Sequence, residues 1–170
     1  MSIVHTNIPY HSSILENNLK DLLQEYPFLN STIIGYSVRG KPLYSIRFGN
    51  GSKEVFYAAS FHANEWITSP ILMKFIEDVC KAFVSDSNIL GLSARELLRN
   101  TTFHLCPMVN PDGVDLVTDS LDKNSSSYLL AQKIADSYPT IPFPNGWKAN
   151  IKGVDLNLQF PARMGKCKGN

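Results

Sequence analysis

The alternation of apolar and polar residues predicts two amphipathic helices. The first covers residues 12–26, where apolar side chains recur at helical spacing, Ser12 or Ser13 could cap the start, and Pro27 ends the helix. The second covers residues 68–84, with an expected inner stripe of Ile71, Leu72, Phe75, Ile76, Val79 and Phe83. Shorter helical stretches are expected at residues 92–98 and 126–137.

Four apolar segments are predicted to be strands. Residues 31–38 and 42–48 form a hairpin through the turn R-G-K. Residues 54–61 are almost entirely apolar, which is typical of a strand covered on both faces. Residues 101–109 form another strand, and the strong turn signal N-P-D-G follows it. Strands that alternate with helices predict an α/β fold with a mixed, mostly parallel sheet flanked by helices.

Composition and charge narrow the functional class. The chain has 170 residues, 44% of them hydrophobic, and shows neither repeats nor a linker, so residues 1–170 are assigned to a single domain. A net charge of +1 gives no basic face for nucleic acid. Three cysteines without paired spacing do not suggest a disulfide framework. Without a signal-peptide pattern or a long apolar run, we expect a cytoplasmic protein with no membrane contact.

Candidate chemistry begins at H-A-N-E, residues 62–65, directly after a predicted strand. Zinc accepts imidazole nitrogen and carboxylate oxygen, and catalytic zinc usually has three protein ligands, of which His62 and Glu65 could supply two. Alone, the motif is equally consistent with a loop histidine and a glutamate stabilised at a helix start. N-P-D-G at 110–113 and G-V-D-L-N at 153–157 are likewise consistent with a tight turn and a strand end.

The three motifs together, in this order, resemble the zinc carboxypeptidase family. The resemblance covers about residues 30–162, and W-K-A-N-I-K-G-V-D-L-N-L-Q-F-P is its most specific part. That segment looks like the bacterial γ-D-glutamyl-L-diamino acid endopeptidases, which cut the γ-D-Glu–diaminopimelate bond of peptidoglycan stem peptides. The resemblance implies a hydrolase, a metalloprotease that uses Zn²⁺ and acts on a peptide or muropeptide substrate.

The resemblance also assigns roles. His62 and Glu65 match the first two zinc ligands, and Asp155 matches the aspartate that hydrogen-bonds the ligand histidine. Asn157 matches an asparagine that contacts the substrate carboxylate. Lys148 lies near the position of a catalytic arginine that polarises the scissile carbonyl, where a lysine keeps the charge without the bidentate fork.

Two positions depart from the family pattern. Asn64 and Leu158 stand where ordinary carboxypeptidases have arginines, and their loss argues against a plain α-carboxylate exopeptidase. Asn64 is therefore grouped with Asn157 as a substrate-binding candidate. The family has no ligand at His104, so it is interpreted as a satisfied core or strand-face histidine. Cys80 and Cys106 are interpreted as small buried hydrophobes.

The family mechanism also needs a third ligand histidine and a general-base glutamate downstream, and none of residues 158–170 is either. We therefore expect a C-terminally truncated, inactive member of the family with an exposed sheet edge, whose residues 163–170 are an out-of-frame tail. Two alternatives stay open: a muropeptide-binding or non-functional remnant without catalysis, and a metallocarboxypeptidase of other peptide specificity.

Overall fold

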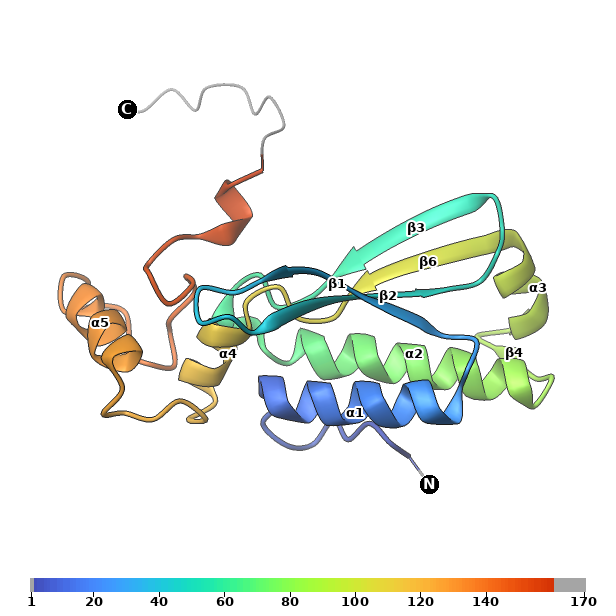
Figure 1. The fold of residues 1–170 in the computed structure, drawn as a ribbon, viewed down its shortest axis with the longest axis horizontal. Helices are drawn as coiled ribbons and strands as arrows, with labels where there is room; N and C mark the ends of the chain where they lie inside the picture. Colours follow the sequence, from blue (N-terminus) through green and yellow to red (C-terminus); the bar gives the residue numbers. More distant parts are fainter. Residues whose placement is uncertain (1, 161–170) are drawn as a thin grey trace.

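The computed structural model describes residues 2–160. Figure 1 shows an α/β arrangement in which one sheet lies against two long helices. The helices are α1 (Ser12–Glu25), α2 (Thr68–Val84), α3 (Ala94–Asn100), α4 (Pro111–Val117) and α5 (Ser126–Ala135). The strands are β1 (Asn30–Tyr36), β2 (Pro42–Phe48), β3 (Lys53–Ala58), β4 (Asn88–Ile89), β5 (Leu92–Ser93) and β6 (Thr101–Cys106). Two short 3₁₀ helices, η1 (Ala63–Glu65) and η2 (Leu156–Leu158), complete the described elements.

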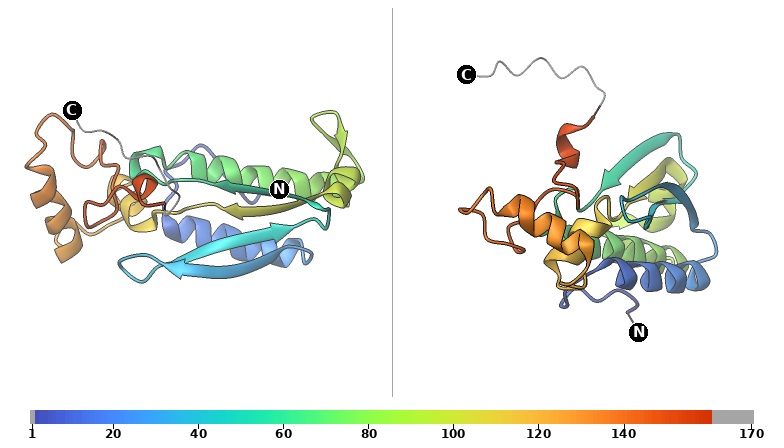
Figure 2. Two further views of the ribbon diagram at one scale, coloured as in Figure 1. Left: turned by 90° about the horizontal axis from the view of Figure 1, so that it is seen from above. Right: turned by 60° about the vertical axis from the view of Figure 1, so that its left-hand side comes forward.

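The larger sheet has the strand order β1-β2-β6-β3. β1 pairs antiparallel with β2, β2 pairs antiparallel with β6, and β3 runs parallel to β6. The predicted α/β class and the antiparallel hairpin are confirmed, but among the described strands the parallel share is smaller than expected. Both α1 and α2 pack on the same face of this sheet (Figures 1 and 2).

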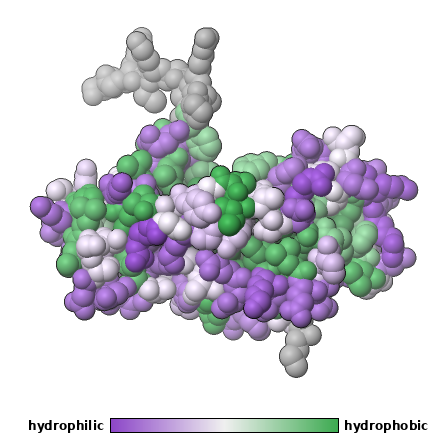
Figure 3. All heavy atoms as spheres, in the orientation of Figure 1, coloured by the Kyte–Doolittle hydropathy of each residue, from purple (hydrophilic) through white to green (hydrophobic). Residues whose placement is uncertain are grey.

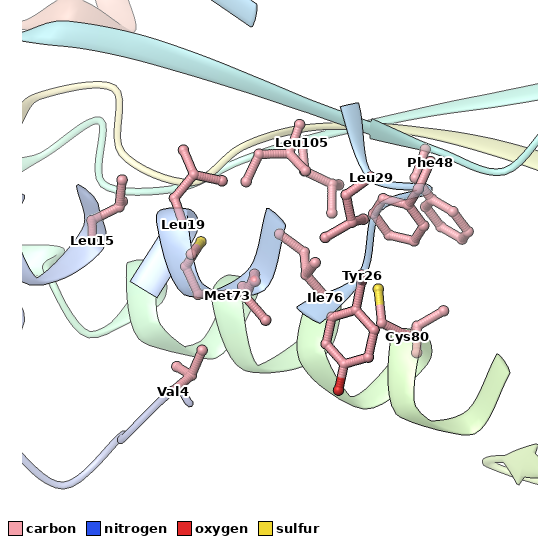
Figure 4. Packing of buried hydrophobic residues seen from close by; sticks show 14 of the residues in the cluster. Val4, Leu15, Leu19, Tyr26, Leu29, Phe48, Met73, Ile76, Cys80 and Leu105 are labelled. Carbon is pink, nitrogen blue, oxygen red and sulfur yellow. The ribbon is translucent and has the colours of Figure 1, made fainter. Parts of the chain in front are cut away.

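The main core lies between the sheet and these two helices. Met73, Ile76 and Cys80 of α2 point towards Leu105 of β6 and Phe48 of β2 (Figure 4). Burial of such side chains contributes about 1.5–3 kcal/mol each, so this layer dominates the stability of the fold. Hydrophilic residues cover the outer side of α1, while apolar ones remain visible between that helix and the sheet (Figure 3).

The predicted inner stripe of α2 is only partly correct. Ile76 and Val79 are fully buried, whereas Ile71 is 57% exposed and Leu72 and Phe75 are half-buried. These three side chains line an open apolar groove beside β3 that also includes Tyr57. The apolar surface of α2 is therefore wider than the described part of the sheet can cover.

The strand predicted at 54–61 is shorter and more exposed than expected. β3 ends at Ala58, and its Phe56 and Tyr57 are 63% and 50% exposed. The prediction of cover on both faces is wrong for the described residues, because these two neighbouring side chains point to opposite faces of the sheet and both are exposed. β3 is also the edge strand of the described sheet. The expected exposed sheet edge is confirmed at the same place.

Two local predictions are corrected near α4. Neither Ser12 nor Ser13 caps α1: His11 is the N-cap, and the main-chain N–H and Oγ of Ser12 donate to Asp115 at 2.8 Å each. N-P-D-G is not an isolated turn but the start of α4, where Asn110 Oδ1 accepts a hydrogen bond from the N–H of Gly113 at 3.1 Å. A residue that accepts at N3 in this way caps a helix.

A buried carboxylate fixes the N-terminal segment against α2. Glu77 is 0% exposed and accepts hydrogen bonds from the main-chain N–H groups of Ile3 and Val4 and from Ser2 Oγ. Lys81 Nζ lies 2.6 Å from the same carboxylate. Because a buried charge needs donors on every side, these contacts explain why this glutamate can lie in the core.

The interpretation of two cysteines as buried hydrophobes is confirmed. Burial raises the pKa of the Cys80 thiol to about 12, and the charge of Glu77 adds to this. Burial also raises the pKa of the Cys106 thiol to about 11. No described helix is long and apolar enough to cross a membrane. Cys167 and the predicted out-of-frame tail, residues 163–170, lie outside the described residues.

Candidate metal centre

The candidate site lies beyond the carboxyl ends of β3 and β6, two parallel neighbours in the sheet (Figure 1). Ligand sites in α/β folds gather at such ends. The chain leaves β3 through Ser60, whose φ of 51° is in the left-handed region. Ser60 N–H donates to Thr68 Oγ1 at 2.9 Å, and Ser60 Oγ lies 2.6 Å from Ser69 Oγ. These bonds to the start of α2 stabilise the strained turn and fix the direction in which His62 leaves it.

His62 lies between two carboxylates. Its Nδ1 is 3.0 Å from Glu65 Oε1, and its Nε2 is 3.2 Å from Asp155 Oδ1. The side chain of His62 is 17% exposed, against 50% for Glu65 and 37% for Asp155. The first and last of the three sequence motifs therefore meet at this imidazole, although 93 positions separate His62 from Asp155.

The chemistry of this donor set fits a metal cation. A neutral imidazole has one N–H, and if Nε2 donates it to Asp155, the lone pair of Nδ1 faces a carboxylate oxygen of Glu65. Two lone pairs at 3.0 Å repel unless a proton or a metal cation lies between them. Imidazole nitrogen and carboxylate oxygen are both ligands that zinc accepts. His62 and Glu65 thus suit a bound zinc ion, with Asp155 behind the histidine.

Asn110 holds the elements of the site together. Besides capping α4, its Nδ2 donates to the carbonyl of Phe61 at 3.2 Å and to that of Ala149 at 3.0 Å. The adjacent Gly113 has no room for a side chain, because a Cβ there would lie 2.6 Å from Asn110 Nδ2 and 2.9 Å from the Ala149 carbonyl. The N-P-D-G motif therefore joins the H-A-N-E turn to the segment that leads to Asp155.

Two main-chain hydrogen bonds complete this junction. Ala63 N–H donates to the carbonyl of Lys148 at 3.0 Å, and Asn64 N–H donates to that of Trp147 at 3.1 Å. Asp112 of α4 in turn accepts from Ser37 Oγ and from Arg39 N–H at 2.9 Å each, which ties the β1–β2 hairpin to the same region. The position of His62 is thus set by backbone contacts from several elements.

The remaining predicted site residues differ in exposure and in their hydrogen bonds. Lys148 and Asn157 are exposed, and Asn157 N–H donates to Asp155 Oδ1 at 2.9 Å. Asn64 is half-buried, and its Oδ1 is buried with no hydrogen-bond partner among the described residues. Leu158, at the position of a family arginine, is 63% exposed. The roles assigned to these side chains stay predictions.

His104 lies on β6 with its side chain 31% exposed, as expected for a strand-face histidine. Its Nε2 is 3.6 Å from Glu54 Oε1, within ion-pair distance, but this buried nitrogen forms no hydrogen bond with any of residues 2–160. Within the same range, no three His, Cys, Asp or Glu side chains are grouped so that they could hold a metal ion. The assignment of His62 and Glu65 as zinc ligands stays a prediction.

Sequence reasoning missed the role of Asn110. The signal was present, because an asparagine followed by proline at the next position is typical of a helix N-cap with proline at N1. The contacts of Asn110 Nδ2 with Phe61 and Ala149 depend on the tertiary fold, and no local pattern indicates them.

Comparison with known proteins identifies the family of this chain. A sequence model of the family described as zinc carboxypeptidase matches residues 15–170. The chain belongs to the zinc carboxypeptidase family. It is 49% identical over 154 residues to γ-D-glutamyl-L-diamino acid endopeptidase 1 of Lysinibacillus sphaericus, covering 91% of this chain and 38% of that relative. It is 38% identical over 155 residues to the protein YqgT of Bacillus subtilis, covering 90% of this chain and 40% of that one.

Solved structures show the same fold. The crystal structure of thrombin-activatable fibrinolysis inhibitor superposes with a TM-score of 0.61 at 20% identity, covering 83% of this chain and 30% of that one. The described part of the chain thus has a carboxypeptidase fold. The chain spans about two fifths of the length of the two curated relatives named above.

Proposed function

We propose that this chain supplies two zinc ligands of a metallopeptidase that hydrolyses γ-D-glutamyl-diamino acid bonds in peptidoglycan stem peptides. The observation that carries the proposal is the imidazole of His62, with Nδ1 turned to Glu65 and Nε2 to Asp155. The 49% identity to a γ-D-glutamyl-L-diamino acid endopeptidase supports the substrate class.

The side chains have distinct tasks in this proposal. A zinc ion, when bound, would activate water and polarise a carbonyl group. Asp155 accepts the Nε2 proton of His62, which keeps Nδ1 unprotonated and makes it a better ligand. Glu65 provides the carboxylate ligand. Lys148 supplies a positive charge that attracts the substrate, and Asn157 and Asn64 contact it.

Residues 1–170 alone are proposed to be inactive. Structural and catalytic zinc sites have three or four protein ligands, whereas His62 and Glu65 are two. We expect this chain to bind zinc weakly and not to hydrolyse the peptide. Tight stoichiometric zinc together with hydrolysis by the 170-residue chain would contradict this.

The alternative is recognition of muropeptides without catalysis. It is favoured by the absence, among residues 2–160, of a group of three side chains that could hold a metal ion. In that case a stem peptide should bind the chain with the same affinity with or without zinc. A zinc-dependent affinity, or hydrolysis in the chimera described next, would exclude it.

A chimera tests the proposed function. Residues 1–160 of this chain would replace the matching part of the Lysinibacillus sphaericus endopeptidase, and hydrolysis of L-Ala-γ-D-Glu-meso-diaminopimelate would be followed by chromatography. We expect activity that falls to background in the His62→Ala and Glu65→Gln variants and is kept in a His5→Ala control. A folded, zinc-loaded chimera that cleaves no γ-D-glutamyl bond would overturn the proposal.

A further inference from the structure

A cavity of about 440 Å³ lies between the C-terminal end of α5 and the loop that leads to Asp155. Its walls are mostly apolar and include the rings of Tyr138, Phe143 and Trp147. Lys148 and Asp155 are the charged residues of the lining. Small-molecule sites occupy about 300–1,000 Å³ and combine apolar walls with a few polar groups, so the cavity has the size and composition of a ligand site.

The charged end of this cavity adjoins the candidate metal centre. Asp155 lines the cavity and also contacts His62 Nε2 at 3.2 Å. The carbonyl of Lys148 accepts the N–H of Ala63, next to His62, at 3.0 Å. A molecule in the cavity would therefore lie beside Asp155, on the Nε2 side of the His62 imidazole.

The charges in the cavity favour an anion at Lys148. Asp155 Oδ1 is already engaged by His62 Nε2 and by the N–H of Asn157. Lys148 is exposed and forms no ion pair with any residue in the described range 2–160. A charge-assisted hydrogen bond between an ammonium and a carboxylate is about twice as strong as a neutral one.

We propose that this cavity holds the γ-glutamyl residue on the acyl side of the cleaved bond, with its free α-carboxylate paired to Lys148. The inference rests on the proposed function and names what selects its substrate. A γ-linked glutamate keeps a free α-carboxylate, separated from the scissile carbonyl by its Cα and two methylene groups. The residue thus offers an anion for Lys148 and methylenes for the apolar walls.

Two synthetic peptides test the pairing without catalysis. L-Alanyl-γ-D-glutamyl-L-lysine carries the α-carboxylate, and L-alanyl-γ-D-isoglutaminyl-L-lysine has a carboxamide in its place. Both would be titrated calorimetrically into the 170-residue chain in the presence of a chelator, which prevents hydrolysis. We expect the acid to bind about tenfold more tightly, the effect of one charge-assisted hydrogen bond. Affinities within about twofold of each other, or no binding of either peptide, would overturn the inference.

Variants locate the effect at Lys148. Lys148→Met should lower the affinity for the acid to that for the amide, and Lys148→Arg should retain the difference. Lys152→Met is the matched control, an exposed lysine outside the cavity lining, and should bind both peptides as the unchanged chain does. Ile141, which lines the cavity, is 48% exposed. Ile141→Asp places a negative charge there and should lower the affinity for the acid more than the affinity for the amide.

Each variant's thermal unfolding midpoint would be measured beside its affinity, so that a folding defect is recognised. A Lys148→Met chain that still prefers the acid, or a Lys152→Met chain that loses the preference, would contradict the assignment. The proposed function fails separately. If the chimera does not hydrolyse its substrate while the acid still binds more tightly, the cavity assignment stands and the catalytic proposal falls. If the chimera hydrolyses its substrate but the acid binds no more tightly than the amide, the catalytic proposal stands and the cavity assignment falls.

Discussion

Two glutamates associated with α2 show how differently this fold uses a carboxylate. Glu77 is 0% exposed and surrounded by donors from Ser2, Ile3, Val4 and Lys81. Glu65, in η1 just before the helix, is 50% exposed and faces a histidine nitrogen. The oxygens of Glu77 accept hydrogen bonds from the protein, and Glu65 keeps oxygen lone pairs available for a ligand. A carboxylate of the first kind stabilises a fold, and one of the second kind can bind a cation.

The same contrast separates two regions. The sheet with α1 and α2 encloses the main core, whose largest side chains are buried completely. Residues 111–158, which include α4, α5 and the segment to Asp155, pack around a smaller cluster that contains Tyr128, Trp147 and Ile151. This second region carries an open cavity and a buried Trp147 Nε1 without a partner among the described residues. Stability is therefore expected to concentrate in the first region and chemistry at the edge of the second.

The largest effect on stability is expected from Glu77→Ala. The change leaves the N–H groups of Ile3 and Val4 without their acceptor and Lys81 without its buried partner. We expect the free energy of unfolding to fall by about 3–5 kcal/mol, as when one member of a buried ion pair is removed. Urea denaturation measures it. Glu65→Gln should change the free energy of unfolding by less than about 1 kcal/mol. If Glu77→Ala also lowers it by less than about 1 kcal/mol, the contrast between the two glutamates is wrong.

The pH dependence of stability gives the next largest effect. Burial alone would raise the pKa of Glu77, but the hydrogen bonds from Lys81, Ile3, Ser2 and Val4 outweigh it and lower that pKa from 4.5 to about 2. A lowered pKa stabilises the fold above the unfolded-state value, and this contribution is lost as pH falls from about 4.5 to about 2. The loss should be about 3 kcal/mol, given 1.36 kcal/mol per pKa unit.

The difference between the unchanged chain and Glu77→Gln isolates this contribution from those of other carboxylates. Unfolding free energies of both proteins would be compared from pH 6 to pH 2 at constant ionic strength. We expect the two curves to converge towards the acid end. Parallel curves would show that Glu77 does not titrate as proposed.

A smaller loss is expected where the two regions meet. Asn110→Ala removes the α4 cap and the donor to the carbonyls of Phe61 and Ala149, and should cost about 2 kcal/mol. Asn124→Ala is the control, because that asparagine is exposed and only its main-chain N–H makes a described hydrogen bond. Equal unfolding free energies for the two variants would show that Asn110 does not join the motifs.

The smallest effect on stability, with a clear effect on metal binding, is expected from Asp155→Asn. Asp155 is 37% exposed, so the change should alter unfolding free energy by less than about 0.5 kcal/mol. Loss of a carboxylate behind a ligand histidine typically lowers metal affinity about 10–100-fold. Competition with a chromophoric zinc chelator measures that affinity. Unchanged zinc affinity, or a destabilisation as large as that of Glu77→Ala, would remove the distinction between the regions.

Much of this picture was accessible from the sequence. α1 and α2 follow from apolar periodicity, the hairpin follows from two apolar runs joined by a turn, and the pairing of His62 with Asp155 follows from the family resemblance. The exposure of Phe56, Tyr57 and Ile71 was not accessible, because apolar patterns report what a residue prefers to contact and not which partner is present. The burial of Glu77 was also missed, since its donors include Ser2, Ile3 and Val4, more than 70 positions away.

The central claim is that His62 presents Nδ1 to zinc while Asp155 holds Nε2–H. Long-range ¹H–¹⁵N spectra of the histidine-labelled 170-residue chain, titrated with excess zinc and assigned with the His62→Ala variant, test it directly. We predict that zinc shifts the Nδ1 signal of His62 to that of a metal-bound nitrogen while Nε2 keeps its proton. An unchanged His62 under saturating zinc, or zinc bound through Nε2, would contradict the claim.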